Sequence, residues 1–420
     1  MKRIIIFSIT SILILISVTG VCGWKIGQMF KGILNDDPSR FKEGYKYFSW
    51  CAGGVPLVSN LPEILNKDYV VLLQNNTELR ATGGFMGSYA RLRFRNGTLQ
   101  NTKFEDIYEP DGQLYGYVKP PAPLDLAFDH GSWKLRDSNW DPDFRVSAPQ
   151  IAWFFGQGGE VVDGLVALNL TTVLKVLEVL EMPTKNLVNL AQTSAEIHKD
   201  KRGFLSTTAG EILSNLKNLK YPGLLKLLWV VYGDLRNKQI LLWAKDPEVQ
   251  KVITQKYWDG GLGEYSQDYL YIVESNLGAN KANCCIEREV TQEITSNLEK
   301  LTIKFTNNNE FTNPKPPVFW GGDYINYLRV IVPVRAEIKD FQNYDIEIRD
   351  KFKIVGMWVK ISAKETKSVE IFYELPTIDN KYSVLVKRQP GIESFSYKLI
   401  YNGKIIKNTQ IDRDLSIVVQ

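Results

Sequence analysis

Histidine is scarce in this sequence, and its scarcity argues against several kinds of site. The 420 residues include only His130 and His198, too few for a multi-histidine metal centre or a catalytic histidine dyad. No serine has a partnered histidine, and no two carboxylates stand out as a glycosidase pair. The net charge of +4 is small and spread along the chain, so it gives no reason to propose nucleic acid as a partner.

The four cysteines form no recognisable framework. Cys22 lies at the end of an apolar run, Cys51 follows alone, and Cys284 and Cys285 are neighbours. Three cysteines outside the apolar run cannot all pair within one chain, and no CxxC motif suggests a zinc site. We therefore expect the adjacent cysteines to be inert apolar residues.

The amino end predicts a membrane anchor. Lys2 and Arg3 precede an uncharged run over 4–24, about 20 residues, which matches the thickness of a bilayer's hydrocarbon core. The alternative is a cleaved signal peptide, although Val18–Cys22 lacks the small residues of a cleavage site. We expect residues 1–24 to be an uncleaved, single-pass anchor in the cell membrane, with the bulk of the chain extracytoplasmic.

Strands and helices alternate through the first half of the chain, which predicts a layered α/β domain. We expect a juxtamembrane helix and connector over 25–63 and the α/β domain over 64–286, with Tyr269–Ser275 as one more strand of that domain. Leu228 is among the apolar residues of a long helical region that we expect to face a core. The strands and helices expected within the domain are a strand at 69–73, a hairpin at 86–108 turning at Asn96-Gly97, a helix at 146–155, a strand at 161–168 and a helix at about 171–180.

From about residue 287 the sequence becomes rich in Thr, Val, Ile and Tyr in short alternating runs. Turn residues separate these runs at regular spacing, including Asn402-Gly403. The pattern predicts a β-sandwich over 287–420. The predicted strands are 301–305, 327–332, 352–359, 368–373, 382–387 and 395–401.

A polar loop follows the first buried strand, and it is the first candidate site. At Gln74 the apolar run gives way to amides, a carboxylate, a guanidinium and hydroxyls, then two glycines. The alternative is an ordinary hairpin with polar turns. In layered α/β proteins, however, ligands gather where a loop leaves the carboxyl end of a buried strand. Arginine offers a fork that fits phosphate, and glycines let backbone N–H groups approach an anion. The candidate ligand-binding residues of this loop are Asn75, Asn76, Arg80, Thr82, Gly83 and Gly84.

A second polar cluster runs from Leu135 to Arg145. Its oxygen ligands at alternate positions resemble the opening of a calcium loop, but Pro142 replaces the required glycine, so an EF-hand is excluded. A partial Mg²⁺ or Ca²⁺ site at Asp137, Asn139 and Asp141 is one interpretation. The other is that these carboxylates cap the following helix and pair with Arg136 and Arg145.

Together the two clusters suggest a cradle for a pyrophosphate. Arg80, Arg136 and Asp137 are the candidate catalytic residues, with Asn139 and Arg145 as further ligand-binding residues. Cations and a divalent ion, Mg²⁺ here, neutralise a pyrophosphate before a phosphoryl oxygen is displaced. The hypothesis requires the two loops to meet over one sheet.

Several motifs give the chain a family resemblance from about residue 65 to the C-terminus. It resembles the bacterial family catalogued as domain of unknown function 4012, whose members resemble exported, singly anchored envelope proteins. The motifs are Gln74-Asn75-Asn76-Thr77-Glu78-Leu79-Arg80, Thr82-Gly83-Gly84-Phe85, Arg136-Asp137-Ser138-Asn139-Trp140, Val162-Asp163-Gly164, Asn276-Leu277-Gly278 with Asn280-Lys281, and Gln389-Pro390-Gly391.

More distantly, the order of elements resembles the LytR-CpsA-Psr family. Its members are anchored enzymes that move glycan polymers from polyprenyl pyrophosphate lipids to the cell wall with arginines, aspartates and Mg²⁺. On that likeness, Asn76 and Arg80 occupy the places of the family's first aspartate and following arginine. Arg136–Asn139 and Gly158-Gly159 lie near its Lys-Ile-Asn-x-Ala…Gly-Gly segment. Glu109-Pro110-Asp111 stands where that family has Pro-Arg-Asp, and its late run of arginines has no counterpart.

Two functions from different classes follow. The first is an envelope protein that binds, and in an active form transfers, a polyprenyl-pyrophosphate-linked or cell-wall glycan, which would make it a phosphotransferase. The second is a non-enzymatic adhesion or scaffold protein with a degenerate site. An open basic pocket beside Arg80 and Arg136 would favour the first. Arginines saturated by internal carboxylates would favour the second.

Overall fold

The computed structural model describes residues 20–52, 54–55, 57–129, 131–184, 201–315, 320–339, 344–376 and 382–419. The predicted anchor lies outside the described residues up to residue 19. Within these ranges, no helix has both the length and the apolar character needed to cross a bilayer.

A helical hairpin forms the amino-terminal end of the described chain. Residues 20–34 are helical and are followed by α2 (Pro38–Cys51) and the short α3 (Leu61–Ile64). Asp37 caps α2 by accepting a hydrogen bond from the Arg40 backbone N–H at 3.0 Å. A disulfide joins Cys22 to Cys51, with their Cα atoms 6.0 Å apart. The hairpin thus brings Cys22, near the end of the apolar run, beside Cys51, a pairing that the sequence analysis did not predict.

The vicinal cysteines were also predicted incorrectly. Cys284 and Cys285 form a disulfide at the end of the short 3₁₀ helix η2 (Ala282–Cys285). They are therefore not the inert apolar pair that was expected.

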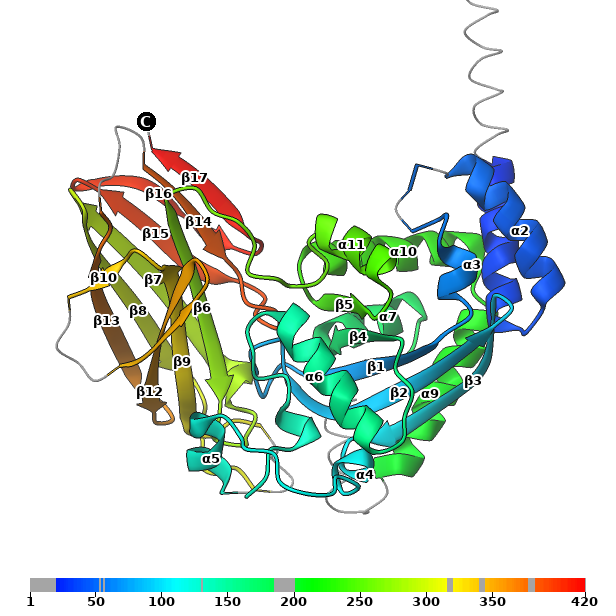
Figure 1. Ribbon diagram of the computed structural model, residues 1–420, viewed down its shortest axis with the longest axis horizontal. Coiled ribbons are helices and arrows are strands. Elements are labelled where there is room, and N and C mark those ends of the chain that lie inside the picture. The colour runs from blue at the N-terminus through cyan, green and yellow to red at the C-terminus, as the bar shows by residue number, and fades with distance from the viewer. Residues whose placement is uncertain are drawn as a thin grey trace, which may run out of the picture.

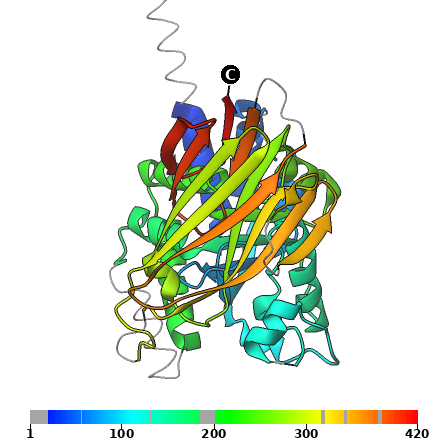
Figure 2. The same cartoon turned by 90° about the vertical axis from the view of Figure 1, so that its left-hand side faces the viewer.

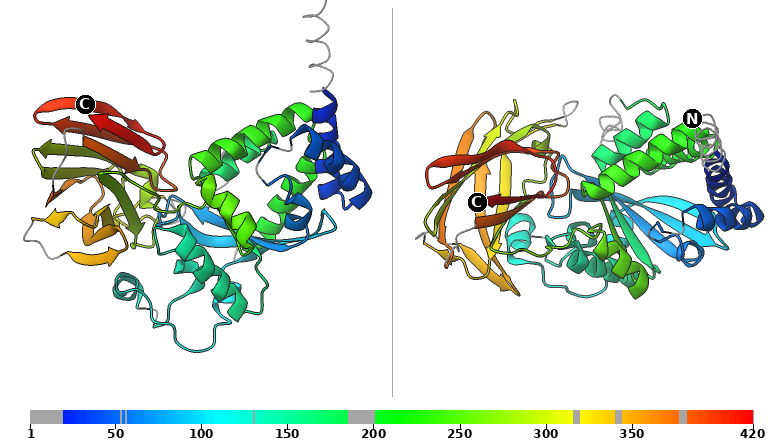
Figure 3. Two further views of the ribbon diagram at one scale, coloured as in Figure 1. Left: turned by 45° about the horizontal axis from the view of Figure 1, so that its top comes forward. Right: turned by 90° about the horizontal axis from the view of Figure 1, so that it is seen from above.

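A five-stranded sheet with helices on both sides forms the α/β domain (Figure 1). The hairpin β2–β3 is antiparallel and turns at Asn96-Gly97, both with positive φ, as predicted. β1 pairs in parallel with β4, whereas β5 is antiparallel to β4. Seen from above, the sheet lies between α6 on one side and α9 and α10 on the other (Figure 3). In spatial order the strands are β3 (Thr98–Asp106), β2 (Phe85–Arg95), β1 (Asp68–Asn75), β4 (Gly164–Asn169) and β5 (Ile240–Ala244).

The helices of this domain follow the predicted order. The core on one face of the sheet is apolar because α6 turns Phe144, Ile151 and Phe155 toward Leu72 and Leu165. The remaining helical elements are α4 (Tyr108–Asp111), α5 (Ala122–Phe128), η1 (Leu135–Asp137), α6 (Phe144–Gln157), α7 (Leu170–Val179), α9 (Lys201–Lys217), α10 (Tyr221–Arg236) and α11 (Pro247–Gln255).

Two six-stranded sheets pack face to face in the second domain, as Figure 2 shows from its outer side. The six predicted strands all lie in this sandwich. One sheet contains β10 (Glu337–Ile338), β13 (Thr366–Glu374), β8 (Leu298–Asn307), β7 (Ile286–Thr295), β15 (Phe395–Tyr401) and β16 (Lys404–Ile411). The other contains β11 (Asp345–Arg349), β12 (Phe352–Ile361), β9 (Tyr324–Pro333), β6 (Asp268–Asn276), β14 (Tyr382–Lys387) and β17 (Leu415–Val419).

One strand was assigned to the wrong domain. β6 lies in the sandwich between β9 and β14, and not in the α/β sheet. All nine of its residues are buried, so its sequence lacks the alternation that marks the other sandwich strands. The sandwich therefore begins at Asp268, before the expected boundary at 287.

Candidate functional site

The first polar loop is built by its own side chains. Asn75 ends β1, and its side-chain oxygen accepts hydrogen bonds from the Thr77 N–H at 3.1 Å and the Thr77 hydroxyl at 2.7 Å. The Glu78 N–H closes the turn on the Asn75 carbonyl at 3.0 Å. An Asx turn of this kind fixes the path of the loop, and it directs Arg80 inward.

Arg80 is almost fully buried and is surrounded by internal partners. Its Nη2 lies 3.0 Å from a Glu78 carboxylate oxygen and 3.6 Å from Asp137 Oδ1, and its Nη1 donates to the Asn276 carbonyl. The guanidinium carbon lies 5.4 Å from the ring centre of Phe85. Burial is the main cause that raises the pKa of Glu78, and the Arg80 charge opposes it. Arg80 is therefore held by two carboxylates and a carbonyl.

Arg136 is held in the same manner at η1. Its Nη1 donates to the carboxylate of Asp111, and its Nε lies 3.7 Å from Asp137 Oδ2. The other Asp111 oxygen accepts from the Leu135 N–H at 2.6 Å. Burial raises the pKa of Asp111, and Arg136 opposes that rise. Sequence reasoning noted Asp111 only as a departure from another family's motif and missed that it is the partner of Arg136.

The two polar loops meet, as the sequence analysis required. Asn139 Nδ2 donates to the Thr82 hydroxyl at 3.1 Å and to the Gly84 carbonyl at 2.9 Å. Gln74 Nε2 also donates to the Thr82 hydroxyl, at 2.9 Å. Together with the Arg80–Asp137 pair, these bonds unite residues about sixty positions apart in one buried polar cluster.

The glycines of the first loop allow protein atoms to pack closely against their α-carbons. A side chain on Gly83, whose φ is +138°, would meet Asn169 Oδ1 at 2.3 Å and Gln74 Oε1 at 2.7 Å. A side chain on Gly84 would meet the Asn75 carbonyl carbon at 2.4 Å. The expected approach of a ligand to this loop is thus taken by the protein itself.

The sandwich closes the cluster from the other side. Gln389 Nε2 donates to the Arg80 carbonyl at 3.0 Å and to the Glu274 carbonyl at 2.8 Å. Asn76 Nδ2 donates to the Gly391 carbonyl at 3.1 Å. A side chain on Gly391 would lie 2.0 Å from the Gly83 carbonyl oxygen. The two domains are therefore joined through the residues predicted to bind a ligand.

Sequence reasoning missed this junction, although it quoted both partner motifs. Asn276 and Gln389 lie 196 and 309 positions from Arg80, and no local pattern links them. Their polar character at the ends of apolar strands was the available signal.

The predicted metal ligands do not converge. Asp141 Oδ2 lies 2.6 Å from Arg349 Nη1, and its Oδ1 accepts from the Asp143 N–H at 2.8 Å. Burial raises the pKa of Asp141, against the Arg349 charge. Asp137 faces Arg80 and Arg136, and Asn139 points its amide nitrogen into the cluster. No group of three or more His, Cys, Asp or Glu in the described part of the chain is placed to hold a metal ion. A Mg²⁺ site does not fit these contacts, because both carboxylates already face arginines.

Arg145 lies outside the cluster, and its environment matches the capping alternative. Asp143 caps α6 by accepting from the Arg145 N–H at 3.0 Å, and its carboxylate pairs with the Arg145 guanidinium at 2.5 Å. A carboxylate at this position favours the helix N-terminus.

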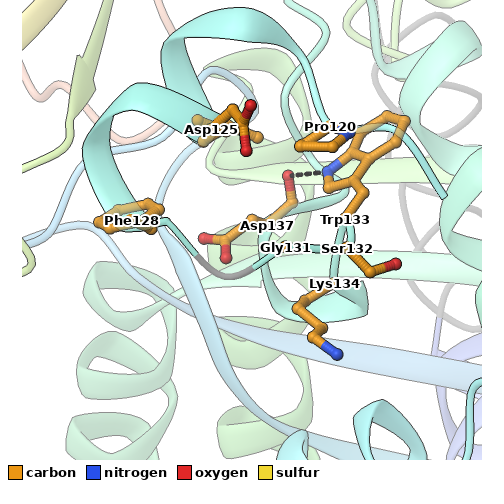
Figure 4. Close-up of a pocket in the computed structure, with 9 residues that line it drawn as sticks. Pro120, Asp125, Phe128, Gly131, Ser132, Trp133, Lys134 and Asp137 are labelled. Carbon is orange, nitrogen blue, oxygen red and sulfur yellow. Dashed lines mark hydrogen bonds between the residues drawn. The ribbon is translucent and has the colours of Figure 1, made fainter. Parts of the chain in front are cut away.

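A small pocket opens beside the cluster, next to Asp137 (Figure 4). The carboxylates of Asp125 and Asp137 point into the space beside Phe128 and Trp133. Trp133 Nε1 donates to the Asp137 carbonyl at 3.2 Å. The pocket thus combines aromatic walls with two carboxylates, and Lys134 supplies the cation at its edge.

Comparison with known proteins gives one finding. A family described as protein of unknown function (DUF4012) has a model that matches residues 66–196. No curated protein and no solved structure matches the chain. The matched segment contains both polar loops, η1 and α6.

Proposed function

We propose, for a chain whose residues 66–196 belong to the DUF4012 family, a non-enzymatic scaffold or adhesion function at the bacterial cell envelope. The single observation that carries this proposal is that each of the three arginines of the candidate site is already paired with an internal carboxylate. Arg80 is paired with Glu78 and Asp137, Arg136 with Asp111, and Arg145 with Asp143. The polar motifs then serve to hold an α/β domain and a sandwich in one fixed arrangement.

The energetics support a structural function for these arginines. To grip a phosphate, Arg80 would have to leave Glu78 and Asp137, so that Glu78 would stay buried without its paired cation and Asp137 would keep only Arg136, at 3.7 Å. Removing one partner of a buried pair costs about 3–5 kcal/mol. A phosphate oxygen would need to recover that free energy before any net binding.

The placement at the envelope draws support from the amino end. The apolar run 4–24 has the length of a bilayer span. Cys22, near the end of this run, forms a disulfide with Cys51, and disulfides persist in oxidising compartments outside the cytosol. Both features favour an anchored protein whose domains lie on the outer side of the membrane.

The test uses the full chain in lipid vesicles with a polyprenyl-pyrophosphate-linked oligosaccharide and Mg²⁺. We expect no glycan transfer, and we expect Arg136→Gln to lower the melting temperature without changing glycan binding. Arg93→Gln is the matched control, because Arg93 pairs with Asp68 on the exposed face of β2. Glycan transfer by the wild type that Arg136→Gln abolishes, with Arg93→Gln unaffected, would refute the scaffold proposal.

A second candidate function is recognition of a lipid-linked or wall glycan, and the pocket beside Asp137 favours it. Aromatic rings with carboxylates suit a sugar, since a ring covers its apolar face and oxygens accept from its hydroxyls. The same two carboxylates repel a pyrophosphate. The pocket therefore supports the glycan part of the predicted ligand.

This second candidate has its own test in the same vesicles. Asp125→Asn should weaken the binding of the oligosaccharide several-fold, since Asp125 is exposed at the pocket and its replacement keeps the shape. Asp129→Asn, in the exposed residue that ends α5 with a left-handed conformation, is the control. Equal affinity of both variants and the wild type would exclude the pocket as a glycan site.

We also propose that the α/β domain is a distant relative of the LytR-CpsA-Psr fold. The order of β1, the polar loop, the β2–β3 hairpin, the polar segment at η1 and then α6 supports this kinship. An experimental structure that superposes on that fold only over isolated hairpins would refute it.

A further inference from the structure

One face of α10 is apolar and exposed. Leu228 and Trp229, at its centre, have 47% and 77% of their surfaces exposed. Leu228 was expected to face a core, and the structure places it outside. At 100° per residue the exposed apolar side chains fall within one arc of about 100° on the helix. They are Tyr221, Leu225, Leu228, Trp229 and Tyr232.

The adjoining buried face of α10 explains why the helix lies here. Leu224, Leu227 and Leu235 are buried, and α10 packs on α7 and β5. The helix therefore has a partner for one face, while its second apolar face is open in the described structure.

The exposed face adjoins the start of the described chain. A side chain on Gly23 would lie 2.1 Å from the hydroxyl of Tyr221, so the first turn of α10 packs directly on the amino-terminal helix. Figures 1 and 3 show α10 beside that helix and α2, at the end of the molecule where the described chain begins. Residue 20 continues the apolar run that starts at residue 4.

We infer that α10 lies on the lipid surface, with its exposed apolar face in the interfacial region of a bilayer that contains anionic lipids. This inference rests on the proposed membrane anchoring, and it adds a second point of attachment. Tyrosine and tryptophan are the residues that concentrate at membrane interfaces, because an apolar ring carries a polar atom.

The charges beside this face favour anionic headgroups over a protein partner. Lys217, Lys220, Lys226 and Arg236 are exposed along α10 and its approach, and each cation near an anionic surface contributes about 1 kcal/mol. The acidic residue of the helix, Asp234, is buried and bound by Thr172 and Lys175. An amphipathic helix with basic residues beside Trp and Leu is the form that binds in the plane of a membrane.

The experiment places a spin label on α10 in the full chain. All four native cysteines are in disulfides, so Trp229→Cys supplies one free thiol. The protein is reconstituted in vesicles of phosphatidylethanolamine and phosphatidylglycerol, and collisions of the label with oxygen and with a water-soluble nickel chelate are compared. We expect the label at 229 to collide mainly with oxygen. The matched control is a label at Trp153→Cys, half-exposed on α6 across the sheet, which should collide mainly with nickel.

The possible outcomes separate the inference from the anchoring on which it rests. Sedimentation with vesicles reports the anchor, whereas collisions at residue 229 report α10. An anchored protein whose labels at 229 and 153 give the same collision ratio overturns the inference and leaves the anchor intact. Protection that grows with protein concentration shows a second copy on this face, and also overturns it.

A second variant tests the cause of the protection. Leu225→Glu with Leu228→Glu changes two exposed side chains and should leave the fold intact. We expect the label at 229 to become accessible to nickel while the protein still sediments with vesicles. Unchanged protection would show that these leucines do not contact lipid.

Discussion

The packing of Gly391 against Gly83 leads to the sharpest prediction about the domain junction. In Gly391→Ala, the new methyl group would lie 2.0 Å from the Gly83 carbonyl oxygen, which is fixed backbone. Gly83 cannot retreat, because Asn169 and Gln74 crowd its own α-carbon. The loop of the sandwich must therefore shift away, and the Asn76–Gly391 hydrogen bond breaks.

The magnitude of this effect follows from two contributions. Alanine at the positive φ of +85° costs about 1 kcal/mol. A buried amide that loses its partner costs about 1–3 kcal/mol, and both Asn76 and Gln389 depend on this loop. We therefore expect Gly391→Ala to lower the free energy of unfolding by about 3–7 kcal/mol.

The control for this prediction isolates the backbone contribution. Gly403 has a similar φ of +78°, in the β15–β16 turn, and no atom lies within 4 Å of a side chain placed there. Gly403→Ala should thus cost only about 1 kcal/mol. Urea unfolding of the full chain in detergent, followed by tryptophan fluorescence and by protease sensitivity, measures both variants. Equal losses in the two variants would refute the close approach of the domains.

Three further predictions concern buried charges. Burial and the nearby Lys238 lower the pKa of Lys387 from its ordinary value of 10.5 to about 7, so between these two pH values the unfolded state binds a proton that the folded state has released. Stability should therefore rise with pH from about pH 7 to about pH 10.5, and Lys387→Met should abolish this rise in urea midpoints. Burial, and then the charge of Asp268, raises the pKa of Glu299 well above its ordinary value. Stability should therefore fall as the pH rises above the ordinary pKa of a glutamate. Glu299→Gln should raise the free energy of unfolding by about 1–2 kcal/mol at neutral pH, and a lower free energy of unfolding would contradict this. Asp111→Asn leaves Arg136 without its closest carboxylate and should cost about 2 kcal/mol, seen as a lower melting temperature.

Local patterns determined what could be predicted from the sequence. The Asn96-Gly97 turn and the cap of α6 depend on neighbours in the chain, so their positions follow from residue type. The meeting of the two polar loops was also predicted, because both were expected to lie beside the same sheet. Strand β6 could not be assigned to its domain from the sequence. A fully buried strand has the same continuous apolar pattern in either domain, and its partners β9 and β14 lie far along the chain.

The chemistry of the candidate site was harder to predict than its position. In sequence, an arginine beside amides and glycines is typical of a phosphate-binding site. In the structure, the same residues form a buried domain junction, because a carbonyl and a carboxylate from distant parts of the chain bind the arginine. The Asn276 carbonyl and the Asp137 carboxylate supply those contacts to Arg80, and the contact with Asn276 could not be inferred from spacing alone.

A polar junction has a consequence that an apolar one lacks. Apolar surfaces tolerate sliding, since many relative positions bury the same area, whereas directional hydrogen bonds between buried groups are satisfied in one arrangement only. Asn76, Gln389 and the facing glycines therefore select a single orientation of the sandwich on the α/β domain. On the proposed attachment of the amino-terminal helix and α10 to a membrane, that orientation would also fix where the sandwich stands relative to the lipid surface. A scaffold needs this property more than it needs an open site, which is why the pairing of Arg80 with internal carboxylates supports the proposed function.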